Sequence, residues 1–360
     1  MSLKDASRLD DMAFMHSLDR SDMLSRLMTF SRQCRDALSL ADLLEFPVRA
    51  EDASAVAIAG MGGSAIGGDI LQAYLADRLE VPVFVIRDYG LPGYIDTSCL
   101  LFTVSYSGNT EEVLSVFAAA LARGIPSVTI TSGGRLKTLT TEAKRPVIDI
   151  PPGYPPRAAL GFLFFPMLAV LRQKGFCEPD NDVEETIGVL ERQARACGPE
   201  VPAGRNPAKQ IATALSGHMP VFYGARRLAP VVRRWRTQLA ENAGVFAHGD
   251  LFPELNHNEI MSWPGLTAGH KGAVVLLRDQ GDTQNQKRIT ISKEMLQADG
   301  LPCLEVWTEG ESLLARIFSL ICLGDFVSYY LAMLCGIDPT PVERIEQFKR
   351  RLDTASSHGQ

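Results

Sequence analysis

A run of hydroxyl side chains at positions 105–110 offers the residue types that bind phosphate. Ser105, Ser107 and Thr110 can each donate a hydrogen bond to an anion, and Gly108 permits close approach of the backbone. The run follows an apolar stretch typical of a buried strand and precedes residues with helical spacing, so we expect it at a helix N-terminus, where free N–H groups favour anions. The pattern predicts a phosphate cradle, although helix capping by Ser107 or Thr110 is an equally common use of such residues.

A glycine-rich segment that begins at Gly60 follows another apolar stretch about 40 residues earlier. Five glycines within nine residues indicate a backbone that turns sharply or lies against a ligand. The spacing of Gly60, Gly62 and Gly63 before Ser64 matches a dinucleotide-binding fingerprint only superficially, because Asp88 is a poor match for the acidic residue expected about 20 positions later. A nucleotide-dependent oxidoreductase is therefore the least favoured of the three functions that we consider. We expect both loops at the carboxyl edge of one parallel sheet.

The second half of the chain offers proton-transfer groups. Glu241 lies in the last turn of an expected helix that ends at Gly244, where the negative end of the helix dipole disfavours a charged carboxylate and suits a general base. His257 is flanked by Asn256 and Asn258, which are potential orienting partners for an acid or base. Both residues also have common noncatalytic roles, because a glutamate near a helix end is usually solvated and a loop histidine is usually structural.

Arg157 stands at the expected start of a helix, an unfavourable position for a cation unless it meets an anionic ligand. Metal binding is not expected, because His248, His257 and His270 lack the spacing of a zinc site and the seven cysteines form no CxxC pair. The cysteines are expected to be free thiols, as in a reducing compartment, which favours a cytoplasmic protein.

The elements that must position these residues form a repeated α/β pattern. We expect an N-terminal helical segment at 1–45 and two doubly wound parallel-sheet domains at 46–197 and 208–360, separated by a segment rich in proline and glycine. The acidic helix expected at 182–196 could belong to either domain. Expected strands are 55–59, 82–86, 100–105, 126–131, 146–150, 219–223, 272–277 and 303–307; expected helices include 65–77, 111–123, 136–143, 158–174, 227–243, 292–299 and 311–335. Residues 223–225 are expected to replace the first glycine loop in the second domain.

Composition excludes several classes of protein. The chain has 360 residues, 46% of them hydrophobic, which is enough for two globular cores. No apolar run is expected to span a bilayer, the longest lying near 158–171. The formal net charge of −6, without a long basic tract, makes nucleic acid an improbable partner.

Taken together, the motifs at 60–64, 105–110, 156–157, 241–242, 256–259 and 338–341, with Lys349, resemble the bifunctional phosphoglucose/phosphomannose isomerase family. The resemblance implies two sugar-isomerase (SIS) domains and interconversion of glucose 6-phosphate and mannose 6-phosphate with fructose 6-phosphate, without metal or cofactor. It also implies a homodimer in the cytoplasm.

The same resemblance implies a role for each motif residue. The backbone at Gly62 and Gly63 and the hydroxyls of Ser64, Ser105, Ser107 and Thr110 would hold the sugar phosphate. Glu241 would be the base that moves a proton between C1 and C2, and Arg157 would stabilise the enediolate. His257, from the neighbouring subunit, would open the sugar ring, Lys349 would assist, and Thr340 would make room for the mannose epimer.

A noncatalytic sugar-phosphate regulator of the same fold is the alternative. Such a protein would keep Ser105, Ser107 and Thr110 but would need neither Glu241 nor His257. The presence of both proton-transfer groups therefore favours the enzyme.

Overall fold

The structure, a computed structural model, describes residues 6–41, 45, 48–269 and 271–357. Short helices begin the described chain: α1 (Met12–Leu18), α2 (Met23–Met28) and α3 (Phe30–Leu38). Asp22 is the N-cap of α2 and accepts a hydrogen bond from the Ser25 N–H at 3.3 Å, and the Asp19 carboxylate accepts from the N–H groups of Met23 and Leu24 at 2.8 and 2.9 Å. The predicted N-terminal helical segment is confirmed, and its residues 1–5 and 42–44 lie outside the described residues.

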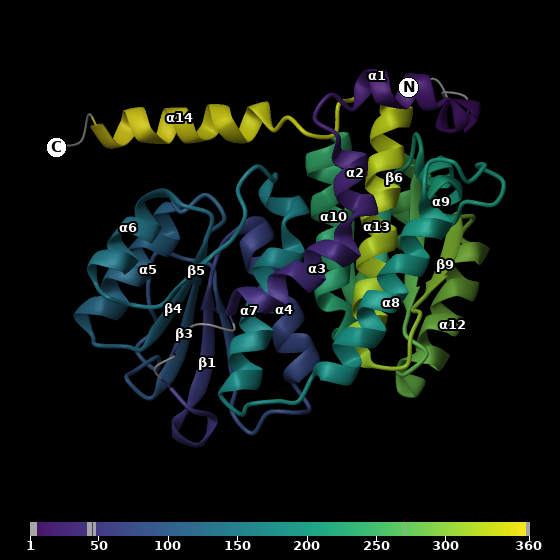
Figure 1. The fold of residues 1–360 in the computed structure, drawn as a ribbon. Helices are drawn as coiled ribbons and strands as arrows, with labels where there is room; N and C mark the ends of the chain where they lie inside the picture. Colours follow the sequence, from purple (N-terminus) through teal and green to yellow (C-terminus); the bar gives the residue numbers. More distant parts are fainter. Residues whose placement is uncertain (1–5, 42–44, 46–47, 270, 358–360) are drawn as a thin grey trace.

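The first sheet has five parallel strands in the order β2-β1-β3-β4-β5 (Figure 1). The strands lie close to their predicted positions: β1 (Ala55–Ala59), β2 (Val83–Ile86), β3 (Cys99–Val104), β4 (Ser127–Thr131) and β5 (Val147–Asp149). Every residue of β1 and β3 is buried, which explains their largely apolar sequences, because a parallel sheet is covered on both faces. Ala59 pairs with Thr103, so the loops after β1 and β3 leave the sheet side by side.

Helices cover both faces of this sheet: α4 (Gly62–Leu75), α5 (Glu111–Ala122), α6 (Gly134–Glu142) and α7 (Leu160–Gln173). α4 begins at Gly62 and not at the predicted residue 65, so the glycine loop itself forms the first turn of the helix. α4 and α7 pack on the inner face, toward the rest of the protein, whereas α5 packs on the outer face.

The second sheet has four parallel strands in the order β7-β6-β8-β9. They are β6 (Met219–Ala225), β7 (His248–Phe252), β8 (Gly272–Arg278) and β9 (Cys303–Trp307). β7 is not among the predicted strands, because its His-Gly-Asp start has no apolar alternation. The expected loop at 223–225 is wrong: Tyr223 and Gly224 pair with Leu276 and Leu277, so β6 continues to Ala225.

The second half contributes α9 (Pro207–Leu215), α10 (Ala229–Ala243), α11 (Trp263–Gly269), α12 (Thr283–Ala298), α13 (Leu313–Cys335) and α14 (Glu343–Ser357). α12 is much longer than the predicted 292–299. Its polar first turns carry no apolar period, and its start depends on Asp282, whose side chain accepts a hydrogen bond from the Asn285 N–H. α9 and α14 had not been assigned.

α13 corrects the expectation that no apolar run could span a bilayer. Leu313–Cys335 is long and apolar enough by length and composition, and exceeds the stretch at 158–171. All of its most apolar window is buried inside the protein, where α8 (Asp180–Cys197), α9 and α10 surround it. Such burial is typical of the central helix of a globular core.

The segment between the two sheets is firmly attached. α8 packs against α13 and α3, so the acidic helix joins the second-sheet side to the N-terminal helices. Lys209, fully buried at the start of α9, donates hydrogen bonds to the carbonyls of Pro199 and Val201 at 2.8 and 2.9 Å and pairs with Asp10. The segment at 198–207 is therefore anchored by buried polar contacts.

The two halves repeat one topology. The unit β1-α4-β2 corresponds to β6-α10-β7, and β3-α5-β4 corresponds to β8-α12-β9, which confirms the imperfect internal repeat. α4 and α10 pack against each other between the sheets (Figure 1). α14, in contrast, extends away from the body, and no element in the described part of the chain packs extensively against it.

Candidate active site

The loop after β3 forms a compact hydroxyl cluster. Ser105 is buried, its Oγ lies 2.9 Å from Oγ1 of Thr110, and it accepts a hydrogen bond from the Gly108 N–H at 3.1 Å. Ser107 is exposed and accepts a hydrogen bond from the Asn109 N–H at 3.2 Å. Thr110 occupies the N-cap position of α5 but makes no side-chain capping bond. The first-turn N–H groups of α5 are thus not satisfied by the hydroxyl, which favours a phosphate cradle over the capping interpretation.

Gly108 is required for the shape of this loop. Its φ of +67° is a left-handed conformation, and a Cβ would overlap the carbonyl oxygen of Gly133 in the loop after β4. A Cβ on Gly134, whose φ is +70°, would likewise overlap the carbonyl oxygen of Ser107. The two loops therefore interlock, which holds the hydroxyls in place.

The glycine loop after β1 adjoins the hydroxyl loop. Ser64, buried in the first turn of α4, accepts a hydrogen bond from the Tyr106 N–H at 3.3 Å. Gly63 lies directly beneath the 156–157 segment, because a Cβ there would stand only 3.0 Å from the Pro156 carbonyl and 3.1 Å from the Arg157 nitrogen. Gly62 is exposed, and nothing lies within 4 Å of where its side chain would be. The expected meeting of the two loops at the carboxyl edge is thus observed.

Arg157 connects these loops to the second half of the chain. Its guanidinium is 3% exposed and donates to Oδ1 of Asn242 at 2.6 Å and to the carbonyls of Pro339 and Thr340 at 2.6 and 2.9 Å. The remaining contact reaches Oε2 of Glu241 at 3.5 Å. Burial lowers the pKa of Arg157, while the Glu241 carboxylate acts in the opposite direction. An anionic ligand was the expected partner of Arg157; the anion that it contacts in the structure is the Glu241 carboxylate of the same chain.

Glu241 lies in the last turn of α10, as predicted, and Gly244 ends the helix with a left-handed φ of +63°. Its side chain is 29% exposed, so the carboxylate is accessible from solvent while its inner side contacts Arg157. The guanidinium offsets the unfavourable field at the helix C-terminus. The arrangement supplies a reachable proton acceptor beside a buried cation.

Thr340 lies next to these groups. Its carbonyl accepts from Arg157, and its N–H donates to Oδ1 of Asp338 at 3.1 Å. Its hydroxyl oxygen is buried and has no hydrogen-bond partner in the described part of the protein. A buried polar atom without a partner is costly in free energy, so this hydroxyl has unused hydrogen-bonding capacity.

A buried network that the sequence analysis missed supports the site. Arg234 pairs with Asp325 of α13 through hydrogen bonds of 2.9 and 2.7 Å and donates to the backbone carbonyl of Arg157 at 2.8 Å. The amide of Asn242, next to Glu241, donates to Oγ of Ser328 at 2.9 Å. An aspartate inside the otherwise apolar segment 313–335 was the available signal, because a buried carboxylate requires a partner.

His257 is not brought to Glu241 within the chain. It is exposed in a 3-10 turn, Glu254–His257, whose Leu255 packs on the outer face of the second sheet. α10 packs on the inner face, so the sheet separates the two residues. The amide groups of its neighbours bond elsewhere: Asn256 donates to Ser292 and Asn258 donates to Glu254.

Lys349 is also apart from the other candidates. It is exposed on α14, the helix that extends away from the body (Figure 1). No hydrogen bond or ion pair of Lys349 occurs among the described residues. One chain therefore unites Glu241, Arg157, Thr340 and the two loops, but neither His257 nor Lys349.

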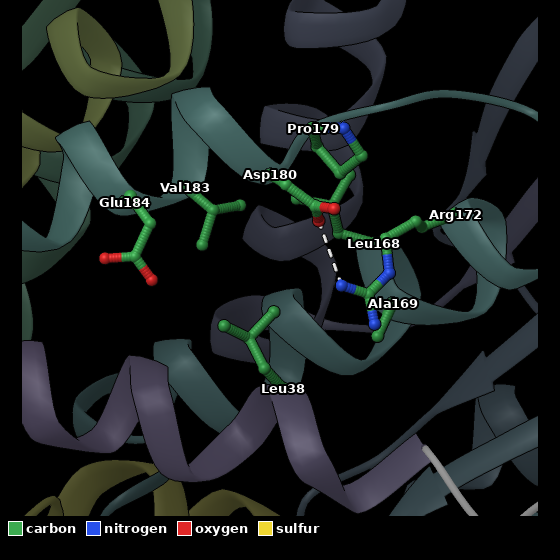
Figure 2. Close-up of a pocket in the computed structure, with 8 residues that line it drawn as sticks. All are labelled: Leu38, Leu168, Ala169, Arg172, Pro179, Asp180, Val183 and Glu184. Carbon is green, nitrogen blue, oxygen red and sulfur yellow. Dashed lines mark hydrogen bonds and ion pairs between the residues drawn. The ribbon is translucent and has the colours of Figure 1, made fainter.

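The cysteines and a small pocket elsewhere in the protein are separate from this site. All seven cysteines are free, and the described residues contain no group of three or more His, Cys, Asp or Glu side chains that could hold a metal. A small pocket of about 160 Å³ lies between α3, α7 and α8, where Arg172 and Asp180 form a 2.9 Å pair across apolar walls (Figure 2). No predicted site residue lines it.

Known proteins are similar to this chain in sequence and in fold. Residues 204–352 match the family described as the bacterial phospho-glucose isomerase C-terminal SIS domain. The bifunctional phosphoglucose/phosphomannose isomerase of Caldicellulosiruptor bescii is 40% identical over 92% of this chain and 98% of its own length, and the protein of that name from Aquifex aeolicus is 36% identical over 82% and 90%. A glucose-6-phosphate isomerase from Chlamydia trachomatis has the same fold, with a TM-score of 0.71 at 15% identity over 90% of this chain and 73% of its own. The chain belongs to the bifunctional phosphoglucose/phosphomannose isomerase family.

Proposed function

We propose that the protein is an aldose–ketose isomerase that interconverts glucose 6-phosphate and mannose 6-phosphate with fructose 6-phosphate. The observation that carries the proposal is the contact of Glu241 with Arg157. The Arg157 backbone in turn lies against the first turn of α4, beside the hydroxyl loop. A proton acceptor, a cation and a phosphate cradle therefore adjoin one another. The reaction requires all three functions.

The phosphate of the substrate binds at the loops after β1 and β3. The α5 N-terminus supplies backbone N–H groups, and Ser64, Ser105, Ser107 and Thr110 supply hydroxyls. The exposed Gly62 allows close approach of the phosphate, and Gly63 allows the Arg157 segment to lie against the same loop. Binding energy gained at the phosphate then positions C1 and C2 of the sugar near Glu241.

Glu241 removes the proton from one of these carbons and returns it to the other. Arg157 stabilises the negative charge that develops on oxygen in the enediolate. A guanidinium has five N–H groups, and the four hydrogen bonds of Arg157 leave one N–H on Nη1 for that oxygen. The chemistry thus uses protein side chains for both proton transfer and charge stabilisation.

His257 reaches the site from a second copy of the chain, so the enzyme is a homodimer. Within one chain the second sheet separates His257 from Glu241. Met261, one turn beyond His257, is 84% exposed, and Phe348 on the extended α14 is 64% exposed; apolar exposure of this kind fits a surface covered by a partner. His257 opens the sugar ring, and Lys349 assists it.

Thr340 accommodates both epimers at C2. Its buried hydroxyl has no partner among the described residues and adjoins the Arg157 contact, so it can bind a substrate hydroxyl in either configuration. The substrates and the seven free thiols fit a cytoplasmic enzyme.

A direct assay tests the proposal. Purified protein is incubated with fructose 6-phosphate, and the glucose 6-phosphate and mannose 6-phosphate formed are resolved chromatographically. Formation of both products is expected. Saturable binding of fructose 6-phosphate without either product would identify a noncatalytic regulator, and stabilisation by NAD would point to an oxidoreductase.

A further inference from the structure

A second polar cleft lies at the opposite end of the α4–α10 pair from Glu241. Its volume is about 840 Å³, within the usual range for metabolite sites. One wall is the C-terminal half of α4 with the start of β2, and the other is formed by residues at the starts of α10 and α12. None of the residues assigned to the isomerase site lines it.

The internal repeat makes this cleft the topological counterpart of the isomerase site. The isomerase site uses the starts of α4 and α5, after β1 and β3, together with the end of α10. The cleft uses the starts of α10 and α12, after β6 and β8, together with the end of α4. Because the two sites occupy corresponding sheet edges, the cleft has the backbone framework of an anion site without its serine loop.

Three arginines line the cleft: Arg226, Arg227 and Arg233. Arg226 precedes α10 and forms no ion pair within the described part of the chain, and the α10 N-terminus has no side-chain cap. Both features leave positive charge available at this wall. The guanidinium fork is well suited to phosphate oxygens.

Three aspartates also line the cleft, but each is engaged. Asp282 accepts from the N–H and side-chain amide of Asn285. Asp69 is held by Arg87, which lies outside the lining, at 2.5 Å, and its longer contact with the half-exposed Arg233 is 3.7 Å. Asp77 pairs with Arg227 at 2.6 Å, and both side chains are largely exposed, at 69% and 45%. Exposed ion pairs contribute little, so an entering dianion can recruit this arginine.

We propose that this cleft binds a phosphate monoester at a site separate from the isomerase site. The phosphate contacts Arg226, Arg227 and Arg233 near the start of α10. The volume exceeds that of the phosphate group alone, and Gln72, Thr283 and Gln284 offer amide and hydroxyl partners for the remainder of the ligand. The proposal does not require isomerase activity, because it rests on different residues.

Calorimetric titration with inorganic phosphate tests the site in full-length protein. The variant Ser105→Ala/Ser107→Ala weakens binding at the isomerase site and should retain one phosphate site per chain. Adding Arg226→Gln/Arg227→Gln should weaken the retained site at least about tenfold, because two bidentate contacts are removed. Adding Arg226→Lys/Arg227→Lys instead should retain part of the affinity, because the charge remains.

The matched control adds Arg32→Gln/Arg205→Gln, which removes the same charge from exposed positions outside the cleft and should leave the retained site unchanged. Circular dichroism verifies folding of every variant. Equal phosphate affinity in the cleft variant and the control would overturn the proposal, as would complete loss of phosphate binding in the serine variant alone. Either result would leave the isomerase proposal standing, whereas an inactive protein that retains the cleft affinity would refute only the isomerase proposal.

Discussion

Replacing Glu241 by Gln separates the chemical role of this residue from its structural role. The change preserves side-chain size and removes the basic oxygen. The ion pair that it disrupts is long, 3.5 Å between Nη1 of Arg157 and the carboxylate, and the Glu241 side chain is 29% exposed. Arg157 keeps its hydrogen bonds to Asn242 and to two backbone carbonyls, so most of its N–H groups stay satisfied, although the buried guanidinium loses its counter-ion.

These contacts set the expected magnitudes. The pair is long and its carboxylate is partly exposed, but its arginine is buried, so its loss should lower the free energy of unfolding by about 1–3 kcal/mol, between the values for exposed and buried pairs, and the melting temperature by about 2–10 °C. Loss of the general base should lower kcat by at least about 10²–10⁴-fold, because no second carboxylate contacts Arg157 among the described residues. Substrate affinity should survive, because the phosphate cradle is untouched.

The assay measures kcat for fructose 6-phosphate together with thermal melting and substrate-induced stabilisation. Glu191→Gln is the matched control, because Glu191 also pairs with an arginine, Arg35 at 2.8 Å, and its side chain is 36% exposed. The Glu191→Gln control should keep full activity and a melting temperature close to that of the wild type. If Glu241→Gln retained more than about a tenth of the wild-type kcat with its fold intact, Glu241 would not be the base.

Three further perturbations test the surrounding structure. Ser105→Ala/Ser107→Ala should raise KM for fructose 6-phosphate by about tenfold or more, because hydrogen bonds to a charged phosphate are lost; unchanged steady-state kinetics would refute the cradle. Mixing Glu241→Gln with His257→Ala protein should restore about a quarter of wild-type activity under random subunit exchange, since half of the dimers would carry one intact site; no recovery despite exchange, followed by mass spectrometry, would exclude a shared site. Asp325→Ala should lower the free energy of unfolding by about 3–5 kcal/mol, because its buried arginine partner loses its counter-ion; denaturant melts showing a loss below about 1 kcal/mol would contradict the importance of that pair.

The spacing of apolar residues was sufficient to predict the strands of the first sheet and the loops that follow them. The buried strands β1 and β3 are short apolar runs, and helices follow them with apolar spacing, so their places could be predicted within a few residues. β7 and the first turns of α12 were missed because their sequences are polar and their conformations depend on strand pairing and on a capping aspartate. Local patterns cannot reveal structure that neighbouring elements impose.

The sequence by itself determined the fold class and the chemical groups: the hydroxyl and glycine loops, Glu241, His257 and Arg157. Only the tertiary structure decided which of them meet. Arg157 and Glu241 are 84 residues apart in the chain. The 3-10 turn that carries Arg157 packs on α4, α4 packs against α10, and Arg234 of α10 donates to the Arg157 carbonyl at 2.8 Å, so the two residues meet. His257, only 16 residues beyond Glu241, is placed across the second sheet, because β7 separates the two along the chain and the sheet has two faces that share no side chains.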